Sequence, residues 1–529
     1  MADTAVIPGR PEYWAMTDPD RPAVVDGDEE VSYAEWNQRS NQLADRLLAL
    51  APTGSRVVVA THTRVEWFLV NLSLAKLGWD HIAVNWKITV PEYVAAIRSS
   101  GASVVVTDHP DPAAILAGIA DLPVTVVSLA ANVDGVVPFG SLCTPSATWP
   151  TGYQPTQRVS AAAAPFVKYT SGTTGLPKAV RRANPLTEEE ARIREETSHR
   201  RIDEIRAERG SVKRHRALIT MPLHHGAGPR GARLAQRDGG TCYLLDQFDP
   251  LAALRIIDQH RITHWSAVPT MLERIRRLPA DVLAHYDVGS IRMIGIGAAP
   301  ASMVLKRWAL DYFGEYLYEG YGASEVGMVT LMEPAMHLLK PGSCGQARPH
   351  VSIRVVDAAG GPLPPGADGD IEVRTPITMS SYLGEASDGR TITEDGFFHT
   401  GDVGHLDEDG FLYITGRSKD LIIRGGVNIS PAYVERVIAE HPAVAEVAVV
   451  GVPDDEFGEQ VAAYCEPMPG AEVTEADILA FAKPQLASYM RPRLLLLVEE
   501  LPRNVMGKVL KAELRARAAV DQLADTEQS

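Results

Sequence analysis

The most informative segment of the sequence runs from Tyr169 to Lys178 and reads YTSGTTGLPK. It places several hydroxyl side chains and two glycines ahead of a lysine. Glycine lets backbone N–H groups turn towards an anion, hydroxyls donate further hydrogen bonds, and lysine supplies a positive charge. This combination predicts a loop that surrounds phosphate groups.

Two better-known sites are excluded by the spacing of their residues. A Walker P-loop requires GxxxxGK[ST], whereas Leu176 and Pro177 stand between Gly175 and Lys178. Farther along, the string GASEV misses the GxSxG nucleophile elbow because Val326 occupies the position of the last glycine. Neither a P-loop ATPase nor a serine hydrolase is therefore expected.

The string YTSGTTGLPK resembles the phosphate-binding signature of the adenylate-forming superfamily, which includes acyl-CoA synthetases, luciferases and peptide-synthetase adenylation domains. Other blocks resemble the same family in the same order, from LAKLGWDHIAVNWKITVPE near the front to LPRNVMGKVLKAEL near the end. The likeness covers nearly the whole chain. It implies an ATP-dependent carboxylic acid:CoA ligase, which forms an acyl-adenylate, releases pyrophosphate and passes the acyl group to a thiol.

The resemblance implies a nucleotide site assembled from several separate loops. Tyr321 would stack on adenine, Asp402 and Arg417 would bind the ribose hydroxyls, and Lys419 would be the hinge of a mobile C-terminal domain. The residues implied for ATP and coenzyme A are Thr170, Ser171, Gly172, Thr173, Thr174, Gly175, Lys178, Gly297, Ala298, Ala299, Pro300, Glu319, Tyr321, Gly322, Ser324, Asp402, Arg417, Lys419, Gly425 and Gly426.

The chemistry of the first step indicates which groups should act in it. A carboxylate must attack the α-phosphate, so cations and N–H donors are needed to bring two anions together. The resemblance gives Lys508 this bridging role, places Mg²⁺ on Glu325, and puts His225 next to the substrate carboxylate. The implied catalytic residues are Lys508, Glu325, His225 and Thr170, and those for the acid are His225, Gly226, Ala227, Gly228, Gly297 and Gly322.

The thiol and the acid are less well defined by the sequence. Gly425 and Gly426 resemble the place where a pantetheine arm passes, and the chain ends soon after Lys508, which favours free CoA over a fused carrier domain. A carrier protein loaded in trans stays an open alternative. The small residues after His225 and the string HGAGPRGARLAQRDGG resemble the branch that handles bulky hydrophobic or alicyclic acids, although these glycines could serve loop geometry alone.

These motifs need a scaffold, and the hydrophobic pattern predicts one of the α/β class. Short β-branched runs such as VVVA, SVVVTD and VTVVSL alternate with stretches of helical periodicity, which indicates mainly parallel sheets. The segment from Ile371 to Tyr413, with its DG turns, indicates a β-rich subdomain. We expect residues 1–418 to form the ATP- and acid-binding domain and residues 419–529 to form a small mobile domain. The charged segment Thr187 to Arg209 predicts a solvated helix.

Composition limits the partners. The net charge of -16 disfavours nucleic acid or an anionic membrane as the main partner. The four cysteines are scattered singly, and no apolar run is long enough for a signal or spanning segment, so a cytoplasmic enzyme acting on small molecules is expected. Homodimerisation is left open.

Overall fold

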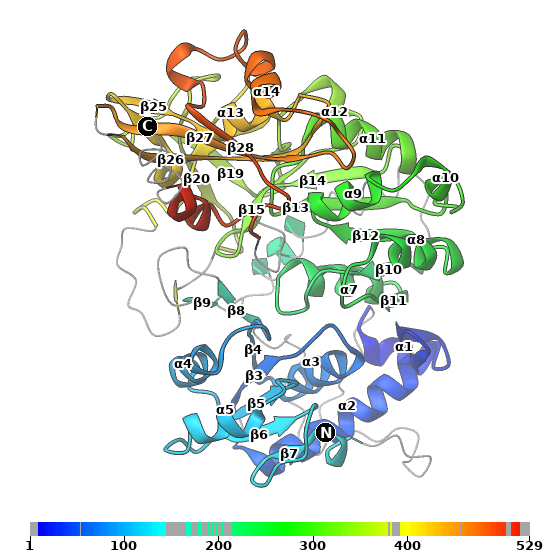
Figure 1. Cartoon of the computed structure of the whole chain (residues 1–529). Coiled ribbons are helices and arrows are strands. Elements are labelled where there is room, and N and C mark those ends of the chain that lie inside the picture. Colours follow the sequence, from blue (N-terminus) through cyan, green and yellow to red (C-terminus); the bar gives the residue numbers. More distant parts are fainter. Residues whose placement is uncertain are drawn as a thin grey trace.

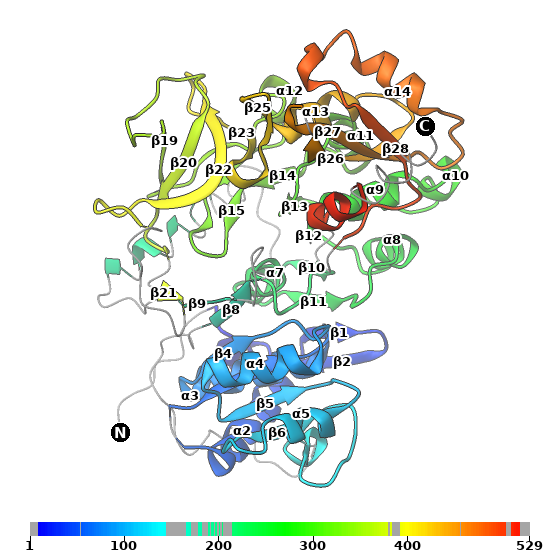
Figure 2. The same cartoon turned by 60° about the vertical axis from the view of Figure 1, so that its left-hand side comes forward.

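The structure is a computed structural model of the 529-residue chain. It describes residues 9–52, 54–143, 166–170, 178–181, 189–190, 192–194, 196–197, 200, 204, 214–378, 381–382, 392–454, 456–503 and 509–518. Figures 1 and 2 show four parts: two parallel sheets in the lower and middle thirds, and above them a β-rich part and the C-terminal part. No helix within the described ranges is long and apolar enough to cross a lipid bilayer.

The first sheet has eight strands, of which the central ones are parallel. Its strands, in spatial order, are β21 (Ser381–Tyr382), β9 (Lys178–Arg181), β8 (Phe166–Thr170), β4 (Asp80–Ala83), β3 (Arg56–Ala60), β5 (Val104–Thr107), β6 (Thr125–Ser128) and β7 (Val137–Pro138). Alternate residues of β3 face two different cores: Val57 and Val59 pack with α2 (Tyr33–Leu50) and α3 (Val65–Leu77), whereas Val58 packs with α4 (Val90–Ser100) and α5 (Pro112–Gly118). Burial on both faces explains the unbroken apolar runs in the sequence.

The second sheet has seven strands, and five of them run parallel to their neighbours. Its strands, in spatial order, are β14 (Leu317–Gly320), β13 (Met293–Gly297), β12 (His264–Ala267), β10 (Arg216–Ile219), β11 (Thr241–Leu244), β1 (Pro22–Asp26) and β2 (Glu29–Ser32). One face is covered by α8 (Pro250–Gln259), α9 (Pro269–Arg276) and α11 (Met303–Phe313).

The two sheets share one core. Trp36 of α2 and Phe68 of α3 pack in the same buried cluster as Val59 of the first sheet and Val24 and Ile219 of the second. Helices α2 and α3 therefore lie between the sheets, together with α7 (Ala227–Gln236), whose Ala232 belongs to this cluster. A shared core of this kind holds the two sheets in a fixed relative position.

The β-rich part is a four-stranded antiparallel sheet, as the sequence predicts. Its strands are β19 (Ser352–Val356), β20 (Gly369–Arg374), β22 (Phe398–Leu406) and β23 (Leu412–Arg417). Short hairpins precede it: β15 (Gly322–Ala323) with β16 (Gly327–Met328), and β17 (Thr330–Leu331) with β18 (Gln346–Ala347). The remaining short elements are α1 (Pro11–Thr17), η1 (Phe139–Ser141), α10 (Ala280–Leu283), α12 (Met336–Leu339) and η3 (Ser488–Met490).

The C-terminal part has a sheet and two cores of its own. Its elements are β24 (Ile422–Arg424), β25 (Val427–Ile429), α13 (Pro431–Ile438), β26 (Val444–Asp454), β27 (Gly458–Pro467), α14 (Glu475–Ala482) and β28 (Leu494–Leu497). The predicted hinge residue Lys419 lies in the single-turn helix η2 (Ser418–Asp420), between β23 and β24. The predicted α/β class is confirmed, with parallel sheets and a separate C-terminal unit.

The charged segment predicted as a solvated helix is described only in part. Its described residues are helical, and Arg192 pairs with Glu189 and Glu196, three and four residues away. Arg200 pairs with Glu204 in the same way. These pairs are the kind that a solvated helix surface makes.

Candidate active site

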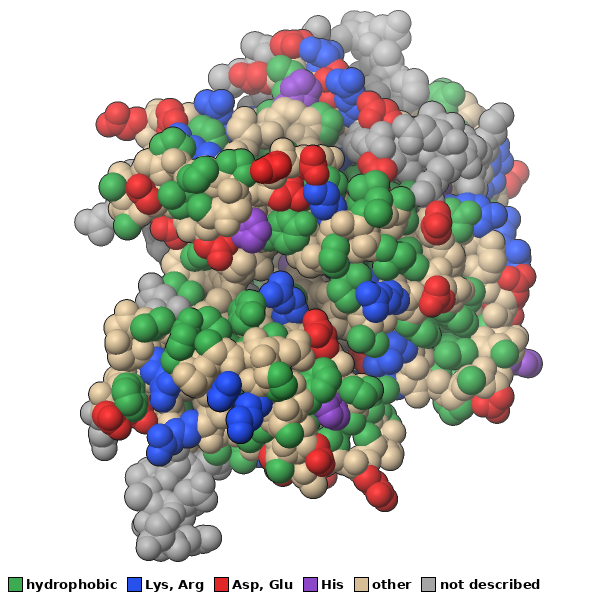
Figure 3. Space-filling model, turned by 90° about the horizontal axis from the view of Figure 1, so that it is seen from above, with side chains coloured by type: hydrophobic (Ala, Val, Ile, Leu, Met, Phe, Trp, Pro, Cys, Tyr) green, Lys and Arg blue, Asp and Glu red, His purple; other side chains and the backbone are tan. Residues whose placement is uncertain are grey.

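Three of the predicted loops follow neighbouring parallel strands of the second sheet. The segment from His225 to Gly228 follows β10, Gly297 to Pro300 stands at the end of β13, and Tyr321 to Glu325 follows β14. Strands β10, β12, β13 and β14 are parallel, so their carboxyl ends lie at one edge of the sheet. Ligands of open α/β sheets bind at this edge. Figure 3 shows that the upper face of the molecule is hollowed near its centre.

The loop after β13 is held tightly against β14. A Cβ on Gly297 would lie 2.7 Å from the carbonyl oxygen of Gly320, so only glycine permits this approach of the two strand ends. The next residue, Ala298, has a φ of 68°, which is unusual for a residue that is not glycine. Such strain costs about 1 kcal/mol or more and is concentrated at binding sites. The geometry favours the predicted role of this loop in nucleotide binding.

Tyr321, Asp402 and Arg417 form one network, although they come from distant parts of the chain. The Tyr321 hydroxyl donates to Asp402 Oδ2 at 2.6 Å, and Arg417 Nε lies 2.8 Å from Asp402 Oδ1. Asp402 and Arg417 are direct partners across β22 and β23. Burial, and then the Asp402 charge, raises the pKa of Tyr321, so its hydroxyl stays protonated and can donate. The predicted adenine and ribose residues are thus in contact with one another.

The side chain of Glu319 lies elsewhere than predicted. It is buried and forms an ion pair of 2.5 Å with Lys306 of α11, and His337 Nδ1 lies 3.9 Å from the same carboxylate oxygen. Burial raises the pKa of Glu319, which the Lys306 charge opposes. Because this side chain is engaged with α11, a role for Glu319 in nucleotide binding is restricted to its backbone.

His224 and His225 form the turn that leads into α7. The His225 N–H donates to Pro222 O at 3.0 Å, and the His225 carbonyl accepts from Gly228 N at 3.2 Å. Burial, followed by the charges of His225 and Lys87, lowers the pKa of His224 to about 3, so this ring is neutral near pH 7. Its Nδ1 is buried and has no hydrogen-bond partner among the described residues.

Gly228 is small for a structural reason rather than to leave room for substrate. A Cβ there would lie 2.6 Å from the carbonyl oxygens of both Met221 and Pro222. The glycine therefore lets the first turn of α7 pack on the backbone that precedes it. The packing of Gly228 therefore weakens the prediction that this glycine widens the acid pocket. Gly226 and Ala227 are only partly buried, so for them the prediction stands.

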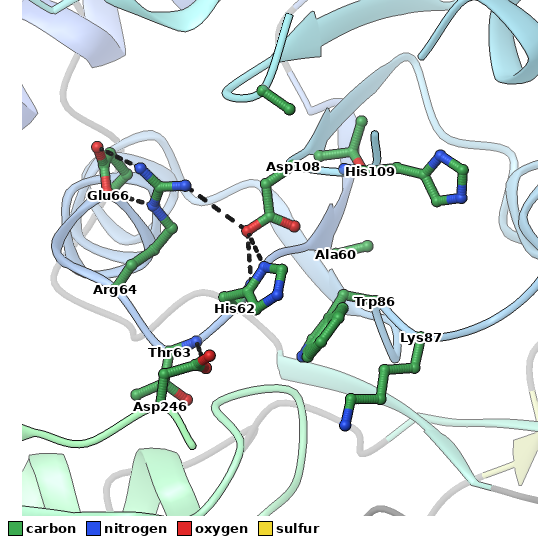
Figure 4. A network of polar contacts seen from close by, with 12 residues as sticks. Ala60, His62, Thr63, Arg64, Glu66, Trp86, Lys87, Asp108, His109 and Asp246 are labelled. Carbon is green, nitrogen blue, oxygen red and sulfur yellow. Dashed lines mark hydrogen bonds and ion pairs between the residues drawn. The ribbon is translucent and has the colours of Figure 1, made fainter. Parts of the chain in front are cut away.

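A polar network that the sequence analysis missed lies where the two parallel sheets meet, and Figure 4 shows it. The backbone N–H and ring Nδ1 of His62 lie 2.8 and 2.7 Å from Asp108 Oδ2, and Arg64 Nη1 lies 3.7 Å from the same oxygen. The Thr63 N–H donates to Asp246 Oδ1 at 2.8 Å. Since Asp246 follows β11 of the second sheet, this bond joins the two sheets.

Trp86 and Lys87 extend this network beyond His62 (Figure 4). The Trp86 ring packs on His62 with centroids 3.5 Å apart and the ring planes tilted by 31°, and Lys87 Nζ lies 4.9 Å from the Trp86 centroid. Lys87 is also one of the charges that lower the pKa of His224. A positive side chain thus lies near the predicted acid site. The string NWK that carries it, which lies within the segment LAKLGWDHIAVNWKITVPE, was the available signal.

Several predicted residues fall at the edge of the described chain or beyond it. Ser171, Gly172, Thr173, Thr174, Gly175 and Lys508 lie outside the described residues. Thr170 pairs with Lys178 across β8 and β9, so the predicted phosphate loop connects two antiparallel neighbours. Gly425 and Gly426 form the tip of the β24–β25 hairpin, with φ of 56° and 81°. A two-residue turn with both φ values positive by itself favours glycine, so the pantetheine role stays a prediction.

The predicted Mg²⁺ site contains one carboxylate, that of Glu325, with the Ser324 hydroxyl beside it in sequence. No group of three or more His, Cys, Asp and Glu side chains in the described part could hold a metal ion. A single carboxylate fits Mg²⁺, which is commonly bound by one or two carboxylates and by substrate phosphates. Glu325 therefore suits a metal ion that arrives with the nucleotide.

The two-sheet scaffold, with its strand-end loops and its Tyr321–Asp402–Arg417 network, has the form expected of an adenylate-forming enzyme. A model of the family described as AMP-binding enzyme matches residues 11–383, and the model of its C-terminal domain matches residues 433–508. The chain therefore belongs to the AMP-binding enzyme family, and the resemblance seen in the sequence is confirmed.

Individual relatives are similar over almost their whole length. The fatty acid–[acyl-carrier-protein] ligase ScoC of Streptomyces coeruleorubidus is 31% identical, over 96% of this chain and 95% of its own. The indoleacetate–CoA ligase of Aromatoleum aromaticum is 32% identical, over 96% of each chain. The solved structure of the amide bond synthetase McbA from Marinactinospora thermotolerans has a TM-score of 0.80 and 26% identity, over 96% of this chain and 99% of its own. The protein is an AMP-forming acid–thiol ligase, and ATP, Mg²⁺ and coenzyme A are the cofactors of such enzymes.

Proposed function

We propose that this protein is an acyl-CoA synthetase that activates a bulky carboxylic acid through an acyl-adenylate. The observation that carries the proposal is the contact between Tyr321 and Asp402, because it brings the predicted adenine residue to the predicted ribose residue. The loops that carry His225 and Ala298 follow parallel strands whose carboxyl ends lie at the same edge of the second sheet. The acid would then enter beside the nucleotide.

In the first step a carboxylate oxygen attacks the α-phosphorus of ATP. The new bond joins the acid to AMP, the bond to the β-phosphate breaks, and pyrophosphate leaves. Lys508 would neutralise the approaching anions, and the Thr170–Lys178 loop would hold the leaving pyrophosphate. Mg²⁺ bound at Glu325 would offset phosphate charge. In the second step the thiol sulfur attacks the acyl carbonyl, AMP leaves, and the thiol proton passes to water or to the phosphate.

The two steps can be separated with Lys508→Ala. This variant should lose pyrophosphate release from acid and ATP, yet it should still convert a supplied acyl-adenylate to a thioester. Glu325→Gln should instead raise the Mg²⁺ concentration needed for the first step. Undiminished pyrophosphate release by Lys508→Ala would contradict the proposal.

The acceptor thiol has one specific alternative to free CoA. One relative bears a name that assigns it an acyl carrier protein, and another bears a name that assigns it CoA. We favour CoA because Gly425 and Gly426 resemble the family's pantetheine passage. Thioester formation with CoA should therefore proceed without any carrier, and activity confined to carrier proteins would select the alternative.

We also propose that residues 419–529 rotate about Lys419 between the two steps. In the present arrangement Arg277 at the end of α9 forms an ion pair of 2.8 Å with Glu466 of β27. Arg503, a few residues before Lys508, pairs with Glu446 at 2.6 Å and with Glu466 at 3.4 Å. The Glu466 carboxylate thus contacts both Arg277 of the N-terminal part and Arg503, which precedes Lys508. Rotation of residues 419–529 about Lys419 must therefore break the Arg277–Glu466 pair.

A further inference from the structure

A buried ion pair joins the two elements that carry the predicted nucleotide loops. Helix α11 begins shortly after the Gly297–Pro300 loop, and Lys306 lies at the end of its first turn, with its N–H donating to Ser302 O at 3.0 Å. Strand β14 ends directly before Tyr321, and Glu319 is its penultimate residue. Lys306 Nζ lies 2.5 Å from Glu319 Oε2. The pair therefore connects the element that follows one loop to the element that precedes the other.

The ion pair lies at the buried interface between α11 and the second sheet. Lys306 is 3% exposed and Glu319 is 7% exposed. Around them, Leu305 of α11 packs in the same buried cluster as Ile296 of β13 and Leu317 of β14. Apolar contacts have no preferred direction, so by themselves they leave α11 free to shift along the sheet. Separating two opposite charges inside a protein is costly, so the ion pair favours one position of α11 on β14.

The backbone holds Glu319 in a fixed place. Its N–H donates to Met332 O at 3.1 Å, and its carbonyl accepts from Met332 N at 2.7 Å. In the parallel pair of β13 and β14 it is the partner of Ile296, which precedes Gly297. The carboxylate is thus a fixed point beside both loops, and Lys306 attaches α11 to it.

The neighbouring His337 is neutral, so Lys306 supplies the positive charge. His337 Nε2 lies 3.2 Å from Leu317 O, and this nitrogen carries the proton because a carbonyl oxygen can only accept. His337 Nδ1, which lies 3.9 Å from Glu319 Oε2, is then unprotonated. Burial, followed by the Lys306 charge, lowers the pKa of His337 to about 4, which keeps the ring neutral near pH 7.

We propose that the Lys306–Glu319 ion pair positions the two nucleotide loops, so that Gly297–Pro300 and Tyr321 contact the same nucleotide. Both members are positioning residues, because they act through the elements that carry the loops. The inference rests on the proposed function, which assigns these loops to ATP. It also gives Glu319 a different role from the direct contact with the nucleotide that the sequence resemblance implied.

A purely stabilising role is the competing explanation, and the two roles predict different results. Burial of two charges carries a desolvation cost that their attraction offsets only in part, so a buried pair adds little net stability. Removing one partner is destabilising because it leaves the other charge unpaired. When both charges are replaced, stability should largely return, whereas the positioning of the loops should stay lost.

The test measures ATP binding and stability separately in variants of the full-length chain: Lys306→Met, Glu319→Gln, the double variant with both substitutions, and Lys76→Met. Lys76 of α3 is the matched control, because it is also 3% exposed but donates to Asn37 Oδ1 of α2 at 2.6 Å. Equilibrium dialysis with Mg²⁺ and without acid gives the Kd for ATP. Pyrophosphate release with the best substrate among hexanoate, decanoate and para-toluate gives kcat and the KM for ATP. Thermal unfolding without nucleotide reports stability.

Each single substitution at Lys306 or Glu319 should raise the Kd and the KM for ATP about tenfold or more, while kcat at saturating ATP changes less than about threefold. The double variant should have a similar Kd, because the two residues act as one unit. Its melting temperature should lie above those of the two single variants, since neither charge is left unpaired. Lys76→Met should lower the melting temperature and leave the Kd for ATP unchanged.

An unchanged Kd in the double variant would overturn the inference, and this variant is decisive even where a single variant does not fold. An equal rise of the Kd in Lys76→Met would also overturn it, because ATP binding would then follow general stability. Independent effects of the two single substitutions, which multiply in the double variant, would do the same. A wild type that binds no ATP would refute the proposed function itself, whereas wild-type ATP binding with unaffected variants would refute only the positioning role.

Discussion

The ribose-binding role of Asp402 can be tested by Asp402→Asn, which preserves shape and removes charge. The side chain is buried, and its two oxygens already accept from Tyr321 at 2.6 Å and pair with Arg417 at 2.8 Å. A carboxylate has about four lone-pair positions, so about two are left for the ribose hydroxyls. An asparagine retains one acceptor oxygen, and Tyr321 and the ribose would compete for it.

Asp402→Asn should weaken nucleotide binding more than it lowers the free energy of unfolding. A hydrogen bond to a charged group contributes about 1.5–3 kcal/mol, so losing one such bond to ribose should raise the KM for ATP about ten- to one-hundredfold. The Arg417 side chain is 40% exposed, so water screens its ion pair with Asp402. Breaking that pair should therefore cost about 1 kcal/mol or less in folding.

The measurement is pyrophosphate release at saturating acid, with thermal unfolding followed in the absence of nucleotide. Tyr321→Phe is the matched control, because it removes one bond to Asp402 and leaves both carboxylate oxygens for ribose. Its KM for ATP should rise less than that of Asp402→Asn. An unchanged KM in a folded Asp402→Asn protein would refute the assignment of this network to ribose.

Three further predictions concern burial, the domain contact and helix packing. Burial lowers the pKa of His81 from 6.5 to about 3. Between these two pH values the unfolded chain binds a proton that the native chain does not. The free energy of unfolding is therefore at its full value above pH 6.5 and falls by ~2 kcal/mol at about pH 5. His81→Gln should remove this contribution, so the difference in melting temperature between about pH 7.5 and about pH 5 should become smaller than in the wild type. An unchanged difference would contradict the prediction. Arg277→Met should remove the pair with Glu466 and speed proteolysis near the hinge, whereas the same substitution at exposed Arg255 should not. Gly228→Ala should lower stability by about 1–3 kcal/mol, since its Cβ would meet two backbone oxygens at 2.6 Å, and an undiminished melting temperature would show that α7 can shift.

The scaffold could be predicted because local pattern and tertiary burial agree. Strand β5 reads VVVT and is buried at every position, as a parallel strand covered on both faces should be. Helix α2 spans Tyr33–Leu50, and it starts where Ser32 Oγ accepts from Glu35 N at 3.2 Å.

The contacts within the site were less predictable, because they join residues far apart in the sequence. Motif resemblance named Tyr321 and Asp402 separately, but their mutual hydrogen bond spans 81 positions and could not be read from either motif. Glu319 shares a motif with Tyr321, yet Glu319 lies within β14 and pairs with Lys306 of α11, whereas Tyr321 follows the strand.

The network of Tyr321, Asp402 and Arg417 adjoins the predicted hinge. Arg417 is the last residue of β23, and the turn with the predicted hinge residue begins immediately after it. That turn is held on both sides: Ser418 Oγ donates to Asp370 Oδ1 at 2.8 Å, and Arg515 Nη2 donates to Asp420 Oδ1 at 3.0 Å. A nucleotide that draws Asp402 and Arg417 towards its ribose would therefore pull directly on the backbone from which the C-terminal part extends. Departure of pyrophosphate leaves this contact in place, since AMP keeps its ribose, so the contact can hold the intermediate while the Arg277 side of the interface is released.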